Sequence, residues 1–168
     1  HKGALEGGTP TFAVLGNGVD ICYPSSSRGI YKRIPEKNGG IISEYQPGTP
    51  GMAYHFPARN RIISGLADVV VVVEAKEKSG SLITAELAVE QNREVFCVPP
   101  ADIYDRRYAG NIRFLRDGAV AVYGYEDIAG YFNPFENDTE EEIPEIDEPE
   151  ISQEVPENSE NSDDSEKT

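Results

Sequence analysis

The chain has 168 residues, enough for one domain of ordinary size, and its 15 basic and 30 acidic side chains give a net charge of −15. Its two cysteines and two histidines are widely separated, which excludes a disulfide framework and a zinc site of the usual spacing. No apolar run approaches the roughly 20 residues of a membrane helix, so we expect a cytoplasmic protein that contacts no membrane and uses no metal or other cofactor.

Short apolar runs alternate with amphipathic stretches along most of the chain. In chain order we expect a strand at 11–15, a helix at about 25–37 capped by the serines at its start, a strand at 41–44, a helix beginning at 57, a strand at 69–73, a helix at 82–91, a strand at 94–98, a helix at 109–116, a strand at 120–122 and a helix at 125–132. This alternation predicts an α/β fold with a doubly wound, mostly parallel sheet. The five consecutive valines at 69–73 are typical of a central strand covered on both faces.

The acidity is concentrated at the C-terminal end. Residues 134–168 contain 15 acidic side chains and one basic side chain, a net charge of −14, which leaves 15 acidic and 14 basic ones, a net charge of −1, for residues 1–133. The total charge disfavours a nucleic-acid partner, but a nearly neutral domain at 1–133 is compatible with a local cationic site. Few apolar residues remain in 134–168, so we expect this part to be a disordered acidic tail or linker.

Several segments follow expected strands, at the edge where folds of this class bind ligands. The first, Gly16-Asn17-Gly18, allows a backbone to approach a ligand closely. Ile21, however, stands where a dinucleotide-binding fingerprint has its third glycine. A plain tight turn and a phosphate contact therefore both remain open for this segment.

The second segment, residues 56–61, places Arg59 and Arg61 in the first turn of an expected helix, where the helix dipole disfavours a cation. Arg59 is spaced to project from the core-facing side of that helix, over the sheet, and needs an anionic partner. That partner is either a carboxylate, such as Glu44 or Glu74, or a phosphate bound by the guanidinium fork.

The third segment is a loop of small residues that leads into the next helix and includes Gly80, Ser81 and Thr84. Free backbone amides and the positive helix end would bind an anion there, or Ser81 simply caps the helix. A fourth segment contains the cations Arg106, Arg107, Arg113 and Arg116, which could line a groove. For Arg113 and Arg116 a solvated helix surface is the simpler interpretation.

We predict no catalytic residues. Neither His1 nor His55 has a nucleophile at a recognisable spacing. Acid–base roles for Glu44, Glu74 or Glu86 are an alternative, although carboxylates at strand ends more often pair with nearby arginines.

Taken in this order, the segments resemble the DprA/Smf family of DNA-processing proteins over about residues 1–122. Two blocks together make the resemblance specific: Phe-Pro-x-Arg-Asn-Arg at 56–61 and Ser-Gly-Ser-Leu-x-Thr-Ala at 79–85. Further matching stretches are Ala13–Gly16 with Gly18-Val19-Asp20, Tyr23-Pro24, Ile42-Ser43-Glu44, Gly110-Asn111 and Arg116–Ala119.

The resemblance implies a Rossmann-like domain that binds single-stranded DNA without catalysis, loads the RecA recombinase onto DNA during natural transformation, and usually forms a homodimer. It implies that the DNA pocket includes Arg59, Asn60, Arg61, Gly80, Ser81 and Thr84, to which we add Gly16, Asn17 and Gly18 as candidates. It also implies that the domain at 1–133 lacks the family's first strand–helix unit, whose loss would expose apolar surface beside residues 69–73.

Two other functions stay open. The fold is shared with cytokinin-activating phosphoribohydrolases, which hydrolyse nucleoside monophosphates, and residues 79–86 loosely resemble the glycine-rich motif of those enzymes. A third interpretation is a non-enzymatic interaction module whose acidic tail at 134–168 mimics DNA.

Overall fold

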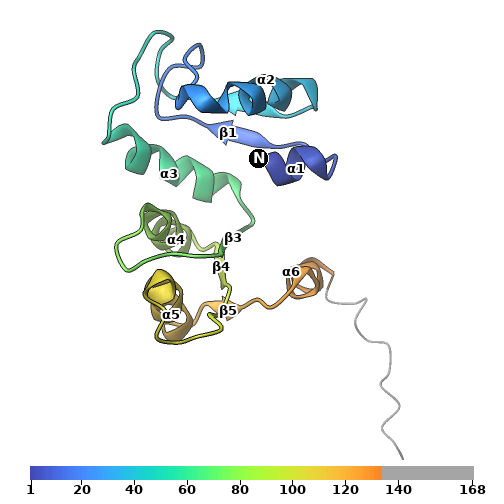
Figure 1. The fold of residues 1–168 in the computed structure, drawn as a ribbon, viewed down its shortest axis with the longest axis vertical. Coiled ribbons are helices and arrows are strands. Elements are labelled where there is room, and N and C mark those ends of the chain that lie inside the picture. Colours follow the sequence, from blue (N-terminus) through green and yellow to red (C-terminus); the bar gives the residue numbers. More distant parts are fainter. Residues whose placement is uncertain (134–168) are drawn as a thin grey trace, which may run out of the picture. The chain divides into compact units, whose positions relative to one another are not determined.

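The computed structural model of the protein describes residues 1–133. In chain order the elements are α1 (Lys2–Glu6), β1 (Phe12–Val14), the 3₁₀ turn η1 (Ser25–Ser27), α2 (Arg28–Glu36), β2 (Gly40–Ile42), α3 (His55–Leu66), β3 (Val69–Val72), α4 (Gly80–Glu90), β4 (Glu94–Cys97), the 3₁₀ turn η2 (Arg106–Tyr108), α5 (Ala109–Arg116), β5 (Val120–Ala121) and α6 (Tyr125–Phe132) (Figure 1). Each expected strand and helix is present in the expected order. None of these helices is long and apolar enough to cross a membrane. The expected tail, residues 134–168, lies outside the described residues.

Every strand pair in the described part of the chain is parallel. β1 pairs with β2, with Ala13 opposite Ile41. β3 pairs with β4, with Val70 opposite Val95, and β4 pairs with β5 on its other side. The α/β class with parallel strands is thus confirmed. The described strands form two sheets, β1-β2 and β3-β4-β5.

Each sheet has its own hydrophobic core, and α3 connects the two within one compact unit. The smaller core joins α1, β1 and α2 through Leu5, Ala13 and Ile34. The larger core lies between the second sheet and the helices α4 and α5, and is formed by Val72, Ala75, Leu82, Ala85, Ala88, Val95, Cys97 and Phe114. α3 contacts β1 and packs along α4 (Figure 1). At the end of this packing, the guanidinium of Arg93 donates to the carbonyl of Gly65 (2.9 Å).

β3 does not have the surroundings expected of a central strand. Val72 is buried, but Val71 is 36% exposed and Val73 is 62% exposed. Among the described strands β3 pairs with β4 alone and therefore lies at a sheet edge. The prediction that residues 69–73 are covered on both faces is wrong, whereas the expected exposure of apolar surface beside them is observed.

An apolar cavity of about 600 Å³ lies where the chain passes from the first sheet to the second. It is lined by β1 and β2 side chains, by the end of α3 and by the first residue of the chain: His1, Phe12, Val14, Ile42, Arg59, Ile63, Leu66 and Ala67. The two described sheets are thus joined by helix packing and not by a shared strand ladder.

Three helix starts differ from the sequence prediction, and one of them is that of α4, which begins at Gly80 and not at 82. Ser25–Ser27 form η1, and α2 begins at Arg28. Ser27 is the N-cap residue of α2, as the sequence predicted, but its side chain forms no capping hydrogen bond. α3 begins at His55, two residues before Pro57, because a proline is accommodated within the first helical turn, where its missing N–H needs no partner.

Candidate functional site

A cavity of about 360 Å³ opens between the first part of α3 and the first turn of α4. Its lining residues are Phe56, Pro57, Arg59, Asn60, Ile63, Gly80, Ser81, Ile83 and Thr84. The two sequence blocks at 56–61 and 79–85, far apart along the chain, therefore meet at one place. Gly80 and Ser81 are exposed there, and Arg59, Asn60 and Thr84 are half-buried.

Arg59 is a cation held by neutral groups. Its guanidinium donates through Nη1 to the carbonyl of Val14, at the end of β1, and through Nε to Oδ1 of Asn60 (3.0 Å), and it lies 5.7 Å from the centre of the Phe56 ring. Burial lowers the pKa of Arg59, because desolvation disfavours the charged form. No carboxylate within residues 1–133 forms an ion pair with it. Its charge is thus left available for an anion from outside the protein.

The helix dipole, from which the sequence predicted an anionic partner for Arg59, has little effect at this residue. Because α3 begins at His55, Arg59 and Arg61 lie in the second turn, where the dipole has little effect. The need of Arg59 for an anion follows instead from its half-burial beside neutral partners. Neither of the carboxylates considered for it, Glu44 or Glu74, pairs with it.

The rest of the cavity offers hydrogen-bond donors and no acidic side chain. Asn60 keeps its Nδ2 amide after Oδ1 accepts from Arg59, and Ser81 and Thr84 contribute hydroxyl groups. A Cβ added to Gly80 would meet no atom within 4 Å, so a ligand can approach the backbone there. Together with the positive end of α4, these groups favour an anionic ligand.

The capping role considered for Ser81 belongs to Ser79. The Oγ atom of Ser79 accepts from the backbone N–H of Ser81 (3.3 Å), and Ser79 is the N-cap of α4. The hydroxyl of Ser81 forms no hydrogen bond with any described residue. It is therefore not needed to close the helix and can serve a ligand.

Arg61 has a different environment from Arg59. It does not line the cavity, and its Nη2 atom contacts both carboxylate oxygens of Glu44 in an ion pair whose side chains are 54% and 51% exposed. An exposed pair of this kind is weak, on the order of 0.5 kcal/mol, because water and salt screen it. Arg61 is thus occupied by a partner that a phosphate group could displace.

Removing that partner gives a first prediction. Glu44→Gln is expected to tighten binding of a single-stranded oligonucleotide about two- to threefold at low salt, because Arg61 is released and one negative charge is lost. Fluorescence anisotropy measures the effect. Glu90→Gln, at the last residue of α4, removes the same charge beside a separate cavity of about 1010 Å³ that also borders the start of β4, and it should change affinity less. Equal effects of the two substitutions would show that Arg61 does not contact DNA.

The Gly16-Asn17-Gly18 turn is packed inside the protein. All three residues are buried, and Asn17 Nδ2 donates to the carbonyls of Gly18 (2.9 Å) and Ile21 (2.6 Å). The carbonyl of Gly16 is hydrogen-bonded to Nδ1 of His55 (2.9 Å), the first residue of α3. The turn does not line the cavity, so in this structure it supports the start of α3, and a direct DNA contact by it stays a prediction.

Asn111 has a role that the sequence analysis did not identify. Its buried side chain accepts from the backbone N–H of Ala75 (2.8 Å) and donates to the carbonyls of Val72 (2.9 Å), Val73 (3.1 Å) and Val98 (3.0 Å). It thereby joins the ends of β3 and β4 and fixes the start of the loop that leads to Gly80. The resemblance had included Gly110-Asn111 as a matching pair, which was the available signal.

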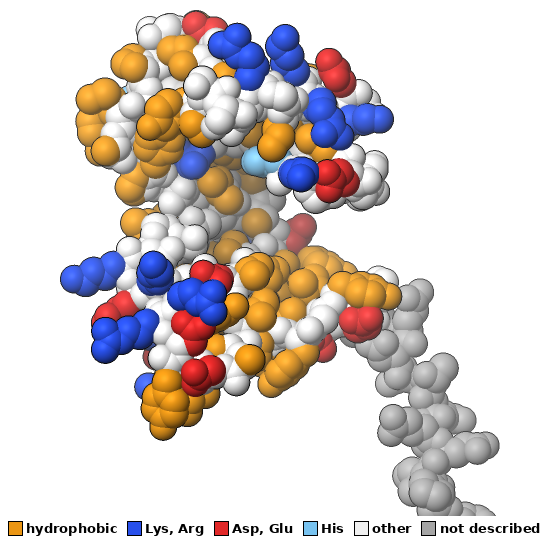
Figure 2. Space-filling view, viewed as in Figure 1, with side chains coloured by type: hydrophobic (Ala, Val, Ile, Leu, Met, Phe, Trp, Pro, Cys, Tyr) orange, Lys and Arg blue, Asp and Glu red, His pale blue; other side chains and the backbone are white. Residues whose placement is uncertain are grey.

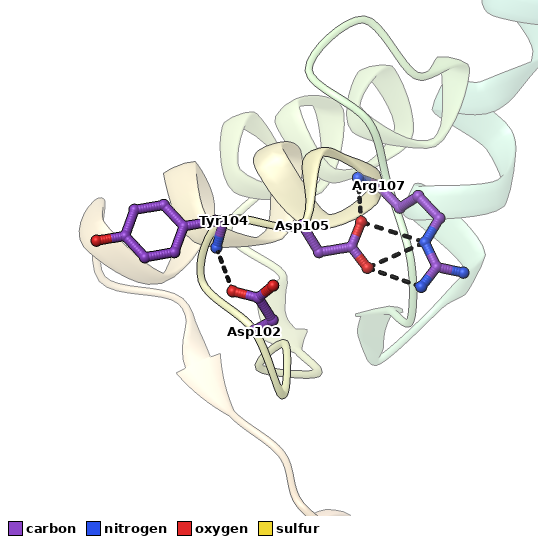
Figure 3. Close-up of polar contacts among 4 residues, drawn as sticks. All are labelled: Asp102, Tyr104, Asp105 and Arg107. Atoms are coloured by element: carbon purple, nitrogen blue, oxygen red, sulfur yellow. Dashed lines mark hydrogen bonds and ion pairs between the residues drawn. The ribbon is translucent and has the colours of Figure 1, made fainter.

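The arginines of the fourth segment have local partners or are solvated. Arg113 pairs with Glu86 and lies over the Phe114 ring (5.2 Å), which fits the solvated-surface interpretation. Arg107 forms a bidentate contact with Asp105, which lowers the pKa of that carboxyl group through hydrogen bonding (Figure 3).

Glu86 and Cys97, two residues considered for a catalytic role, do not line the cavity between α3 and α4. Glu86, the glutamate needed for the phosphoribohydrolase interpretation, is paired with Arg113 and lines a different cavity from the one that contains Gly80. Burial raises the pKa of the Cys97 thiol to about 11, so this cysteine stays protonated and unreactive at neutral pH. Neither position supports an enzymatic function.

Comparison with known proteins assigns the family. A sequence profile described as DNA recombination-mediator protein A matches residues 1–133. The chain is 42% identical over 135 residues to DNA processing protein DprA of Streptococcus pneumoniae (strain ATCC BAA-255 / R6), which covers 79% of this chain and 46% of that protein. It is also 42% identical over 128 residues to Protein Smf of Escherichia coli (strain K12), which covers 76% of this chain and 34% of that protein. The chain belongs to the DprA/Smf family.

Solved structures of DprA proteins share its fold. The X-ray structure of DprA from Streptococcus pneumoniae matches with a TM-score of 0.71 and 41% identity, over 77% of this chain and 45% of that one. DprA from Helicobacter pylori, described for its single-stranded DNA binding mode, matches with a TM-score of 0.62 and 26% identity, over 73% of this chain and 56% of that one. The chain thus spans less than half the length of the curated DprA and Smf proteins it was compared with.

Proposed function

We propose that this DprA/Smf domain binds single-stranded DNA without base-specific contacts, with phosphate groups seated in the cavity between α3 and α4. The observation that carries the proposal is the half-buried Arg59, whose charge has no carboxylate partner within residues 1–133. The donors of Asn60, Ser81 and Thr84 and the open backbone at Gly80 surround the same space. Phosphate recognition by such groups is independent of base sequence.

The wider role is proposed from family membership. We infer that the protein is non-catalytic, acts in the cytoplasm as a homodimer, and assists recombination by loading RecA onto single-stranded DNA during natural transformation. What supports these statements is the match to the DNA recombination-mediator family and to proteins named for DNA processing.

The experiment that tests DNA binding is an anisotropy titration of labelled oligo-dT with the 168-residue chain at several salt concentrations. One phosphate contact each by Arg59 and Arg61 predicts that the logarithm of the binding constant falls with the logarithm of salt concentration with a slope of about −1.4, and each further phosphate contact steepens it by about 0.7. Oligo-dT and a mixed-sequence oligonucleotide should bind alike. Absence of binding at low salt, or binding that ignores salt, would contradict the proposal.

A parallel assay separates this proposal from the enzymatic alternative. The purified chain is incubated with nucleoside monophosphates, and release of free base is followed by chromatography. We expect none. Turnover that is abolished by Glu86→Gln would establish the phosphoribohydrolase function instead.

A further inference from the structure

The loop that follows β4 carries two strongly exposed apolar side chains. Tyr104 is 85% exposed and its neighbour Ile103 is 67% exposed. A tyrosine ring so exposed adds almost nothing to the core, since it removes little apolar surface from water. If the backbone of the loop were free to move, the ring could pack against the protein surface. The exposure of Tyr104 therefore depends on the contacts that fix the loop backbone.

The loop is held by two carboxylates. Asp102 Oδ1 accepts from the backbone N–H of Tyr104 (2.8 Å). Asp105 caps η2 through the backbone N–H of Arg107 (3.0 Å) and also accepts from the guanidinium of Arg107 through Nε (3.0 Å) and Nη2 (2.7 Å). Figure 3 shows these contacts, with the Tyr104 ring pointing away from the Asp105–Arg107 pair. The hydrogen bonds of Asp102 and Asp105 fix the backbone on both sides of Tyr104 and leave its ring exposed.

The helix that follows this loop, α5, is attached to the segment that leads into the cavity. The backbone N–H of Gly110 donates to the carbonyl of Ala75 (2.9 Å), and a Cβ added to Gly110 would lie 2.8 Å from that oxygen. Ala75 precedes the loop that ends at Gly80, and β3 and β4 are parallel neighbours, so both loops leave the same edge of the sheet.

The two loops carry exposed cations together with the carboxylates Glu74, Glu77, Asp102 and Asp105, so their summed charge is close to zero. Arg106, in the Tyr104 loop, is exposed and has no ion pair among residues 1–133, and the same holds for Lys76 and Lys78 in the loop before α4. On the side of the molecule that carries α4 and α5, Lys and Arg side chains lie among Asp and Glu side chains (Figure 2). Cations beside an exposed aromatic ring are the combination by which proteins hold single-stranded nucleic acids.

We propose that Tyr104 is a base-stacking platform that extends the DNA site beyond the phosphate cavity, with Arg106, Lys76 and Lys78 following the sugar–phosphate backbone. The inference rests on the proposed single-stranded DNA binding and adds a contact to the bases. Stacking on one ring tolerates any base, so this contact keeps the binding independent of sequence.

The test compares Tyr104→Ala and Tyr104→Phe with the unsubstituted 168-residue chain in anisotropy titrations. Two ligands are used: oligo-dT, and an abasic oligodeoxyribose phosphate of the same length. Tyr104→Ala is expected to weaken oligo-dT binding about tenfold and to leave binding of the abasic strand unchanged, because only the stacking contact is lost. Tyr104→Phe, which keeps the ring, should bind both as the unsubstituted chain does. Tyr131→Ala is the control, since Tyr131 lines the cavity beside the starts of β4 and β5, at the opposite edge.

The outcomes separate the inference from the function on which it rests. Unchanged oligo-dT binding by Tyr104→Ala, together with a loss in Arg59→Ala, would overturn the stacking role and keep the phosphate site. An equal loss on the abasic strand would also overturn it, because no base is present there. Failure of the unsubstituted chain to bind any oligonucleotide would overturn both. Thermal melts of each variant identify a loss that comes from unfolding, and a Tyr104→Phe variant that binds oligo-dT no better than Tyr104→Ala counts against stacking.

Discussion

Replacing Asn111 with alanine is expected to lower the free energy of unfolding by about 3 kcal/mol, because several buried backbone groups lose their partner together. The Ala75 N–H and the carbonyls of Val72, Val73 and Val98 all bond to this one side chain. Chemical denaturation with urea measures the loss. We also expect weaker oligo-dT binding, since the loop from Ala75 to Gly80 loses its anchor.

A second substitution at the same position tests the orientation of the amide. Asn111→Asp keeps an acceptor for the Ala75 N–H but places an oxygen where Nδ2 faces three carbonyls, so its loss should equal or exceed that of Asn111→Ala. Arg116→Ala, at an exposed position of the same helix, should change stability by less than about 0.5 kcal/mol. A fully stable Asn111→Ala variant would contradict the bonding pattern described for this side chain.

Arg59→Ala is expected to weaken oligo-dT binding about tenfold at low salt, with the salt slope reduced by about 0.7, because one phosphate contact is lost. Arg59→Lys should bind oligo-dT with an affinity between those of the unsubstituted chain and Arg59→Ala, since lysine keeps the charge but cannot contact a phosphate in a bidentate way. Anisotropy titrations at several salt concentrations measure both effects. Arg59→Ala also removes the hydrogen bond to Val14, so the free energy of unfolding should fall by about 1 kcal/mol, which urea denaturation measures.

Arg116→Ala provides the matched control for Arg59. The substitution removes the same charge from the last turn of α5, and Arg116 does not line the cavity between α3 and α4. If both substitutions weaken binding equally, the effect is one of net charge. In that case the cavity would not be the DNA site.

Much of the fold could be predicted from the sequence, because apolar runs and amphipathic stretches mark most of its strands and helices. α5 and α6 begin and end at the residues that the sequence predicted, 109–116 and 125–132. The valines of β3 were misread, because a run of apolar residues shows that a strand avoids water but not which neighbours cover it. Helix starts at His55 and Gly80 differed by two residues, since proline and serine are compatible with several positions in a first turn.

The candidate site was predictable in composition and less so in contacts. The sequence indicated that Arg59, Asn60, Gly80, Ser81 and Thr84 belong to strand-end segments, and the structure places them around one cavity. It could not show that Arg61 faces Glu44 or that Asn17 is buried, because those facts depend on segments that meet only after folding. The role of Asn111 was invisible for the same reason: its partners lie 13 to 39 residues away.

The division of the domain into two sheets has a mechanical consequence. Arg59 is bonded to the end of β1, whereas Gly80 belongs to the half built on β3 and β4, and the two halves meet through α3 and α4. A small shear of one helix along the other would widen or narrow the mouth of the site without breaking any strand ladder. We therefore expect the spacing between the Arg59 guanidinium and the Gly80 backbone to depend on the relative position of α3 and α4, and a bound strand with evenly spaced phosphates to favour one such position.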